Sequence, residues 1–219
     1  HAADVVHDGP EAVSTAHAQY GPIHGIIHAA GIAGTGMMQT KSREQVLAVL
    51  SAKMQGTEWI RECLVAKELD FVLLCSSISA VVPSFGLSDY AAANAYLDGF
   101  AAAFDNPSGT RVLSVNWDTW REVGMAVDIQ VPAAFAHLRD EELKHAIRSA
   151  EAGEVLDRLL NSPLPQVLIS TRNFGDLQRQ TAEAVSTLQN VHRQPAASAV
   201  MGSHSRPASL EEFVAAEDE

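Results

Sequence analysis

Four short apolar runs, separated by stretches with helical spacing, constrain the fold of this chain more than any other feature. The runs span residues 23–28, 70–75, 111–116 and 166–170, and turn-forming residues bound most of them. Short apolar runs of this kind are typical of strands that are buried on both faces. Strands that alternate with helices predict a doubly wound α/β fold, in which helices cover both faces of a parallel sheet.

The intervening stretches predict the helices. Ser42 is followed three residues later by Gln45, a capping-box pattern that opens a long helix. Its apolar positions recur at helical spacing to about residue 67. Further helices are expected over residues 11–20 and 90–104, with a helical pair near residues 140–161.

The charge and the cysteines exclude several classes of protein. The net charge of −12 argues against a nucleic-acid surface, which needs clustered lysine and arginine. No stretch has the length of a membrane-spanning helix, and no basic, apolar signal pattern opens the chain. Cys63 and Cys75 are too few for a disulfide framework and are expected to be reduced, buried thiols. These features favour the cytoplasm.

The two ends of the chain differ in composition from its centre. The opening HAADVVHDG has no initiator methionine and no strand followed by a glycine-rich turn, so a longer parent protein is expected. Residues 178–219 are small, polar and finally acidic, which is typical of a linker or tail. The folded domain is therefore expected to span residues 1–177.

Ligands in such folds bind beyond the carboxyl ends of the strands, which selects the loops after residues 28, 75 and 116. Ser77 follows the second run, and Tyr90 and Asn94 lie one turn apart on the next helix. Reduction of a ketone needs a hydride on carbon and a proton on oxygen. Tyr90 could supply the proton if Lys53, on the preceding helix, stabilised its anion. Ser77 would then polarise the carbonyl oxygen, and Asn94 would hold the lysine or a water.

Each of these residues also has an ordinary structural interpretation. Taken alone, Tyr90 is a half-buried aromatic, Lys53 a solvated helix lysine and Asn94 a polar residue on a helix surface. Ser77, with Ser76, could simply cap a helix or end a strand. His24 and His28 are not expected to share a metal, because four residues of strand separate them by about 13 Å.

Several segments together carry a resemblance to a known family. In order and spacing, the chain resembles the ketoreductase domains of modular polyketide synthases, which belong to the short-chain dehydrogenase/reductase superfamily. Stand-alone members of that superfamily carry a lysine four residues after the tyrosine, where this chain has Asn94, and the lysine here is upstream at Lys53. That exchange is typical of multienzyme synthases. The resemblance covers roughly residues 3–170 and rests on the segments HAAGI (28–32), SAKMQGT (51–57), FVLLCSS (71–77), SDYAAANAYLDGFA (88–101) and SVNWDTW (114–120).

The resemblance implies a Rossmann-like sheet that binds NADPH but lacks its first strands. It places Asp4 and Val5 against the adenine, Asn116 and Trp117 beside the nicotinamide, and a four-residue motif beneath the nicotinamide ribose: His28, Ala29, Ala30 and Gly31. The glycine-rich turn for the pyrophosphate would precede His1. A glycine-rich turn within residues 31–36 is the alternative, although its spacing differs from the usual pattern.

The resemblance also implies a substrate lid over residues 118–140 and a β-ketoacyl group carried on the phosphopantetheine of an acyl carrier protein. The apolar lid residues that could cover the acyl chain are Trp120, Met125, Phe135 and Leu138, and each could equally be a plain surface cover. The stereochemical loop reads Ala33-Gly34-Thr35 instead of the Leu-Asp-Asp of B-type reductases. This favours an A-type reductase, although Val82 replaces the tryptophan of many A-type enzymes.

The expected function is thus the NADPH-dependent reduction of a carrier-bound β-ketoacyl thioester. The expected partners are the acyl carrier protein, the upstream half of the domain and other synthase domains, without nucleic acid or membrane. One alternative is a catalytically incompetent structural ketoreductase fragment within a megasynthase. A stand-alone short-chain reductase is disfavoured by Asn94 and by the tail.

Overall fold

The structure, a computed structural model, describes residues 4–34, 36–66, 69–82, 86–104, 109–128, 140 and 143–193. The chain divides into two units, residues 1–181 and residues 182–219. The first unit holds the sheet and nearly all of the helices, whereas the described part of the second is the end of one helix.

Four parallel strands form a single sheet in the order β1-β2-β3-β4. Their bounds are Gly25–His28 for β1, Phe71–Ser77 for β2, Arg111–Trp117 for β3 and Gln166–Ile169 for β4. All four predicted strands are confirmed, with shifts of one or two residues at their ends. The second strand continues through Ser76 and Ser77, because these residues pair with Asn116 and Trp117 of β3.

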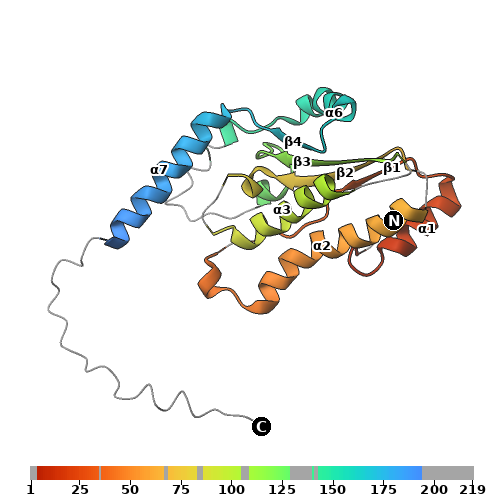
Figure 1. Ribbon diagram of the computed structural model, residues 1–219, viewed down its shortest axis with the longest axis horizontal. Coiled ribbons are helices and arrows are strands. Elements are labelled where there is room, and N and C mark those ends of the chain that lie inside the picture. Colours follow the sequence, from red (N-terminus) through yellow and green to blue (C-terminus); the bar gives the residue numbers. More distant parts are fainter. Residues whose placement is uncertain are drawn as a thin grey trace, which may run out of the picture. The chain divides into compact units, whose positions relative to one another are not determined.

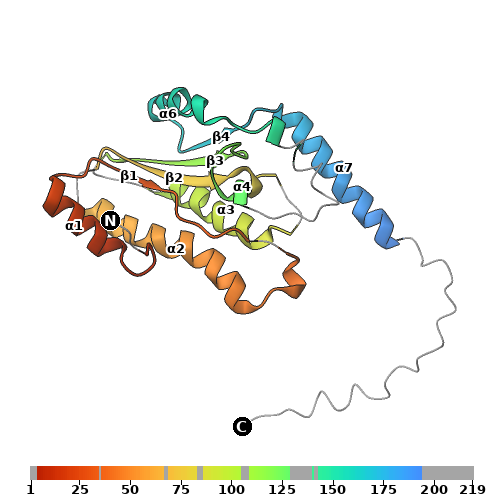
Figure 2. The ribbon, with the colours of Figure 1, turned by 180° about the vertical axis from the view of Figure 1, so that it is seen from behind.

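Helices cover both faces of this sheet, as the sequence predicts. Helices α2 (Arg43–Ala66) and α3 (Ser88–Ala103) lie against one face, and α6 (Ala152–Asn161) lies against the other (Figures 1 and 2). Helix α1 (Gly9–Tyr20) packs beside α2. The Rossmann-like α/β fold expected from the sequence is therefore confirmed.

Alternate residues of β2 and β3 supply two separate hydrophobic cores, which explains why both strands read as nearly continuous apolar runs. Val72 and Leu74 point toward α2 and α3, whereas Leu73 points toward α6. The first core contains Ile60, Leu64, Leu69, Val72, Leu74, Leu97, Ala101 and Val112. The second contains Leu73, Leu113, Val115 and Leu159.

The long helix α2 begins with the predicted capping box. The backbone amide of Ser42 donates to Gln45 Oε1 at 2.9 Å, and the Gln45 amide donates to Ser42 Oγ at 3.3 Å. Two backbone donors that the helix leaves unpaired are thus satisfied by side chains.

Among the described residues, no helix is long and apolar enough to cross a membrane.

The C-terminal third departs from the expectations in one place. In the region of the expected helical pair, residues 140, 143 and 144 are helical, and a 3-10 turn over Ser149–Glu151 leads into α6. Helix α7 runs over Phe174–Arg193, so the region expected to be a linker from residue 178 begins as helix. A polar, alanine-containing composition indicates little burial, but such residues are also compatible with an exposed helix.

Strand β1 lies at an edge of the described sheet and pairs only with β2 there. Ile26 packs into the core beneath α2, whereas Ile27, on the opposite face, is 57% exposed. In the part of the chain that the structure describes, the outer edge of β1 is therefore unpaired, and its second face is uncovered at Ile27.

Candidate active site at the carboxyl ends of the strands

The predicted catalytic residues converge on the carboxyl end of the sheet. Because the strands are parallel, His28, Ser77 and Trp117 end their strands at one common edge. Helix α2 contributes Lys53, and α3 begins at this edge and contributes Tyr90 in its first turn. Residues that lie far apart in sequence thus meet in one region, as expected.

Lys53 is not a solvated helix lysine. Only 2% of the residue is exposed, and its ammonium donates a hydrogen bond to the carbonyl oxygen of Cys75 at 2.8 Å. Burial lowers the pKa of Lys53 to about 8, against the opposing electrostatic influence of Cys75 and Asp98. A lysine with a pKa near neutrality can both hold and release a proton under ordinary conditions.

Tyr90 is partly buried, and burial raises the pKa of its phenol above the ordinary value. Hydrogen bonds with the side chains of Asn94 and Ser77 act in the opposite direction on this pKa. Tyr90 is therefore protonated near neutral pH and within hydrogen-bonding reach of two of its predicted partners. The sequence predicts a Tyr90 pKa lowered by Lys53, whereas in the structure burial is the largest influence on this pKa and raises it.

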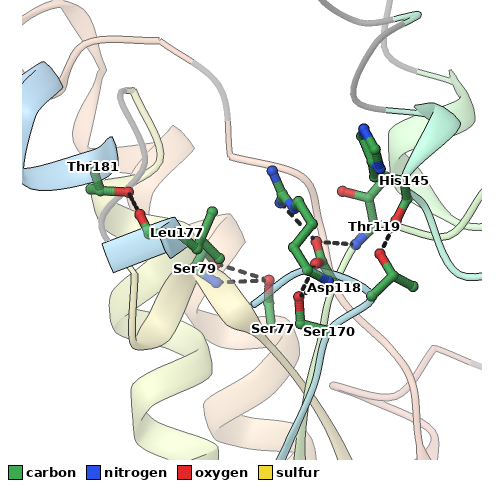
Figure 3. A network of polar contacts seen from close by, with 10 residues as sticks. Ser77, Ser79, Asp118, Thr119, His145, Ser170, Leu177 and Thr181 are labelled. Atoms are coloured by element: carbon green, nitrogen blue, oxygen red, sulfur yellow. Dashed lines mark hydrogen bonds and ion pairs between the residues drawn. The ribbon is translucent and has the colours of Figure 1, made fainter. Parts of the chain in front are cut away.

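Ser77 has a defined hydrogen-bond arrangement at the end of β2. Its Oγ accepts from the Ser79 amide at 3.2 Å and from the Ser79 hydroxyl at 3.0 Å, as Figure 3 shows. Because both bonds use acceptor capacity of the Ser77 oxygen, the Ser77 hydroxyl proton is left for another acceptor. This arrangement suits a donor to a substrate carbonyl.

Asn94 is fully buried one helical turn after Tyr90. Its amide nitrogen donates to the backbone carbonyl of Tyr90 at 2.8 Å. Its carbonyl oxygen is buried and has no hydrogen-bond partner among the described residues. A buried acceptor without a partner is costly, so this oxygen is suited to an ammonium group or a water molecule.

A buried polar network beneath these residues joins α3 to the sheet, and the sequence reasoning did not identify its centre, Asp98. Asp98 Oδ1 accepts from the Ser114 hydroxyl at 2.6 Å, and Oδ2 accepts from the Asn116 amide at 2.7 Å. The same amide lies 3.0 Å from Ser76 Oγ, and Asn116 Oδ1 accepts from Gln166 at 2.8 Å. The spacing of four residues from Asn94 is the signal that could have placed Asp98 on this helix face.

The structure separates Asn116 from Trp117, which were both expected beside the nicotinamide. Successive strand residues point to opposite faces. Asn116 faces α3 with both polar atoms engaged, whereas Trp117 packs in the core beneath α6 and hydrogen-bonds the Cys75 thiol. Contact of Asn116 with a cofactor would therefore have to come from its backbone, and the predicted cofactor role of both residues stays a prediction.

Other predicted cofactor residues are grouped at the end of β1. A Cβ atom placed on Gly56 would lie 2.7 Å from His28 Cε1 and 3.1 Å from Val5 Cγ2, so α2 has a glycine where these side chains approach it. His28 is buried, and burial together with the Lys53 charge lowers its pKa to about 4. Asp4 is exposed, and its carboxylate accepts from the Val6 amide at 2.7 Å.

Gly31 lies directly against the head of Lys53. A Cβ atom placed on Gly31 would lie 3.4 Å from the Lys53 ammonium and 3.0 Å from the Met125 methyl group. Met125, a predicted lid residue in the short helix α4 (Met125–Asp128), and Lys53 therefore both approach Gly31. The preceding residues of the motif, Ala29 and Ala30, are exposed and partly exposed respectively.

The alternative glycine-rich turn within residues 31–36 has a different explanation. A Cβ atom on Gly34 would lie 2.6 Å from the carboxylate of Asp89, and one on Gly86 would lie 3.5 Å from the backbone nitrogen of Gly36. The loop after β1 thus packs closely on the start of α3. Its glycines serve that packing, which argues against a cradle for a pyrophosphate.

The predicted lid begins at a fixed anchor. Asp118 is buried, and its carboxylate accepts from the Thr119 amide at 2.8 Å and from the Ser170 hydroxyl at 2.7 Å (Figure 3). Arg172 forms an ion pair with the same carboxylate at 3.4 Å. Trp120 packs against Trp117 in a tilted arrangement, with ring centroids 5.1 Å apart and an angle of 52° between the ring planes. The remaining lid candidates, Phe135 and Leu138, lie outside the described residues.

A buried ion pair beside the site was also missed by the sequence reasoning. Lys41 Nζ lies 2.6 Å from Asp89 Oδ1, and the two side chains are 5% and 1% exposed. Asp89 directly precedes Tyr90, whereas Lys41 lies in the loop after β1. Because 48 residues separate Lys41 from Asp89, no local spacing in the sequence predicts this ion pair.

Comparison with known proteins identifies the family that this chain resembles. A family model described as the KR domain matches residues 2–122. Phenolphthiocerol synthesis polyketide synthase type I Pks15/1 of Mycobacterium marinum is 31% identical over 186 residues, which cover 81% of this chain and 8% of that protein. Polyketide synthase PksN of Bacillus subtilis is 35% identical over 127 residues, which cover 55% of this chain and 2% of that protein. The chain spans less than a tenth of the length of either relative.

Solved structures show the same fold. An A1-type ketoreductase superposes with a TM-score of 0.67 at 28% identity, covering 86% of this chain and 41% of that one. A-type ketoreductases from a modular polyketide synthase give a TM-score of 0.65 at 30% identity, with coverages of 79% and 36%. An actinorhodin polyketide ketoreductase solved with NADPH, at 18% identity and a TM-score of 0.65, is similar in fold alone.

Proposed function

The chain belongs to the ketoreductase (KR) domain family of polyketide synthases, and we propose that it carries the proton-delivering centre for reduction of a carrier-bound β-ketoacyl thioester with NADPH. The observation that carries the proposal is the convergence of a buried lysine of lowered pKa with a protonated tyrosine, a serine and a buried asparagine. Buried polar residues with a perturbed pKa cluster at functional sites, whereas a purely structural lysine would be expected in solvent with an ordinary pKa.

Reduction of the ketone breaks the carbonyl π bond as a hydride reaches the β-carbon and a proton reaches the oxygen. Ser77 donates a hydrogen bond to that oxygen and stabilises the charge that develops there. Tyr90 then transfers its phenolic proton to the oxygen, which gives the β-hydroxy thioester. The support for these roles is that the Ser79 bonds leave the Ser77 proton available and that the raised pKa keeps Tyr90 protonated.

Lys53 and Asn94 restore the proton on Tyr90. The pKa of Lys53, about 8, leaves much of the lysine protonated near neutral pH and able to pass a proton to the phenolate. The unpartnered carbonyl oxygen of Asn94 is buried beside Tyr90 and can hold a water molecule in this relay. The relay ends in solvent, which replaces the proton.

The nicotinamide half of a dinucleotide site fits the residues at the end of β1. Gly31 carries no side chain where a Cβ atom would crowd Lys53, and Gly56 makes room for His28 and Val5. His28 through Gly31 would line the ribose, and Asp4 with Val5 would contact the adenine. When bound, the reduced nicotinamide supplies the hydride. We assign the turn for the pyrophosphate to a partner segment, the expected upstream half of the domain, which would adjoin the open edge of β1.

The carrier-bound substrate would enter beneath the segment that begins at Asp118. The ion pair of Asp118 with Arg172 anchors the start of this segment, and Met125 approaches Gly31 from it. Closure of such a segment would exclude water from the transfer. The replacement of Leu-Asp-Asp by Ala33-Gly34-Thr35, and the likeness to A-type ketoreductases, support an L-configured alcohol product.

Replacement of Tyr90 by phenylalanine tests the proposal. The experiment uses the chain extended upstream by the segment that completes the sheet, with a β-ketoacyl thioester and NADPH. Loss of the general acid is expected to lower kcat by about 10²–10⁴-fold while NADPH binding is kept. Tyr96→Phe, which removes a hydroxyl that donates to Glu58 at 2.6 Å, is the matched control and should leave kcat unchanged.

A structural fragment without reductase activity is the second candidate, because the described sheet leaves β1 with an open edge. Fluorescence titration with NADPH separates the two candidates when it is applied to the 219-residue chain and to the extended protein. Binding by the extended protein alone supports an enzyme whose cofactor site is shared between the two halves. Absence of binding by both favours the structural role.

A further inference from the structure

We propose that Lys41 and Asp89 form a positioning pair that fastens the loop after β1 to the first turn of α3 and thereby fixes the location and the charge environment of Tyr90. The pair lies outside the set of residues proposed above to contact substrate or cofactor. Its purpose rests on the proposed reductase function, whereas its physical effect on Tyr90 can be measured without any reaction.

The contacts of Asp89 show how the pair acts on the helix start. Asp89 Oδ1 accepts from the backbone amide of Tyr90 at 2.9 Å and from Lys41 Nζ at 2.6 Å. The carboxylate therefore holds an amide that the first turn of the helix leaves unpaired, and it lies where the helix dipole favours a negative charge. The first turn of α3 and Tyr90 are thus tied to Lys41 through one oxygen atom.

The loop contacts Asp89 at a second point. A Cβ atom placed on Gly34 would lie 2.6 Å from Asp89 Oδ1 and 3.1 Å from Oδ2. Lys41 and Gly34 belong to the same loop, so this loop encloses the carboxylate from two positions. The other carboxylate oxygen, Oδ2, is buried without a hydrogen-bond partner among the described residues.

Stability alone does not explain this pair. A buried ion pair often stabilises a protein no more than apolar residues of the same size, and the unpartnered Oδ2 adds a further cost. What the pair does provide is a single arrangement of loop and helix, because any other arrangement separates two buried charges. It also cancels the charge of Asp89, which would otherwise act on the adjacent Tyr90.

Because Lys41 cancels the charge of Asp89, the proposal predicts the direction in which the pKa of Tyr90 changes when Lys41 is replaced. At an effective dielectric constant of about 20, an unbalanced unit charge about 10 Å away shifts a pKa by roughly 1 unit. Asp89 without Lys41 would raise the pKa of Tyr90 by about this amount, because a negative charge disfavours the phenolate. The other ionisable groups that surround this region keep their contacts: His28 of β1, Lys53 of α2, Cys75 of β2 and Asp98 of α3.

The test follows Tyr90 by ¹⁹F NMR in the 219-residue chain labelled with 3-fluorotyrosine. The chain has three tyrosines, so Tyr90→Phe assigns the signal directly. Fluorination makes the phenol more acidic, which brings its titration into a range where the protein stays folded. The variants are Lys41→Met, which removes the charge, Lys41→Gln, which removes the charge but keeps an amide donor, Lys41→Arg, and the double variant Lys41→Met with Asp89→Asn.

The expected results are a Tyr90 pKa about 1 unit higher in Lys41→Met and Lys41→Gln, and values close to wild type in Lys41→Arg and in the double variant. If Lys41→Met does not fold, Lys41→Gln takes its place in the test. An unchanged Tyr90 pKa in Lys41→Gln would overturn the proposal. A Tyr90 pKa in the double variant as high as in the single variants would also overturn it. Because no turnover is measured, these outcomes stand apart from the test of Tyr90→Phe in the reaction.

Discussion

Replacement of Lys53 by methionine tests whether this lysine is buried with a lowered pKa, because the pH dependence of the free energy of unfolding then changes. Methionine has nearly the length of the lysine stem and carries no charge. The change removes the hydrogen bond to the Cys75 carbonyl, which costs a roughly constant 1–2 kcal/mol. It also removes a buried group that the folded protein holds with a pKa of about 8.

The size and sign of the pH-dependent part follow from that pKa. The usual value is 10.5, and the difference of about 2.5 units corresponds to about 3 kcal/mol. Because the folded pKa is depressed, the unfolded chain binds more protons at this site between pH 8 and 10.5 than the folded chain does. The cost of burying the charge is therefore fully present below pH 8 and disappears as the pH rises toward 10.5.

Urea denaturation of both proteins at several pH values between 7 and 10.5 measures this term. The free energy of unfolding of Lys53→Met, taken relative to wild type, should fall by about 3 kcal/mol across that range. His28 stays neutral in this range and so does not contribute. A difference that stayed constant within about 0.5 kcal/mol would refute the reasoning, because it would mean that Lys53 titrates as an exposed lysine.

Three further predictions follow from the same contacts. The free energy of unfolding should fall by about 3 kcal/mol as the pH falls from 6.5 to 4, because His28 has a folded pKa of about 4 and only the unfolded chain binds its proton in this range. Urea denaturation of His28→Gln should show most of this pH dependence lost. Gly31→Ala should lower kcat of the extended protein by displacing Lys53 or Met125, whereas Gly99→Ala, in α3 with nothing within 4 Å, should stabilise the chain by about 0.5–1 kcal/mol. Asn116→Asp places a second carboxylate beside Asp98 and should lower stability by about 3 kcal/mol at pH 8 and less at pH 4. In the exposed control Asn161→Asp, water screens the new charge from Asp157, and the loss should not exceed about 1 kcal/mol.

The strands and the principal helices could be predicted from the sequence because each depends on a local pattern. The apolar runs mark β1 to β4, and Ser42 with Gln45 marks the start of α2. Helix α7 (Phe174–Arg193) is not predicted at all, because the expected linker from residue 178 rests on composition alone. A change toward small polar residues indicates less burial, but it does not distinguish a coil from an exposed helix.

The chemistry of the site could be predicted only in part. Spacing on α3 placed Tyr90 and Asn94 on one face, and the helical repeat of Val49, Lys53 and Ile60 could have shown that the lysine lies on the buried face of α2. The strand alternation could likewise have shown that Asn116 and Trp117 point apart. Both signals depend on the periodicity of a helix or a strand, which motif spacing alone does not reveal.

The contacts of Asp89 and Asp98 could not be predicted, because they join residues distant in sequence. Asp89 pairs with Lys41 from another loop, and Asp98 accepts from Ser114 and Asn116 of β3. A buried carboxylate is recognised by what surrounds it, and its sequence neighbours do not reveal that. Both acids would be read as exposed charges on a helix until the fold is known.

The most direct test of the account is the transfer of deuterium from NADPH deuterated at the nicotinamide C4 to a β-ketoacyl thioester in the extended protein. Mass spectrometry of the product should show one deuterium on the β-carbon with wild-type Tyr90, and product formation slowed by about 10²–10⁴-fold with Tyr90→Phe. Absence of deuterium at the β-carbon, or equal labelling rates in the two proteins, would contradict a reductase centre built around Tyr90 and Lys53.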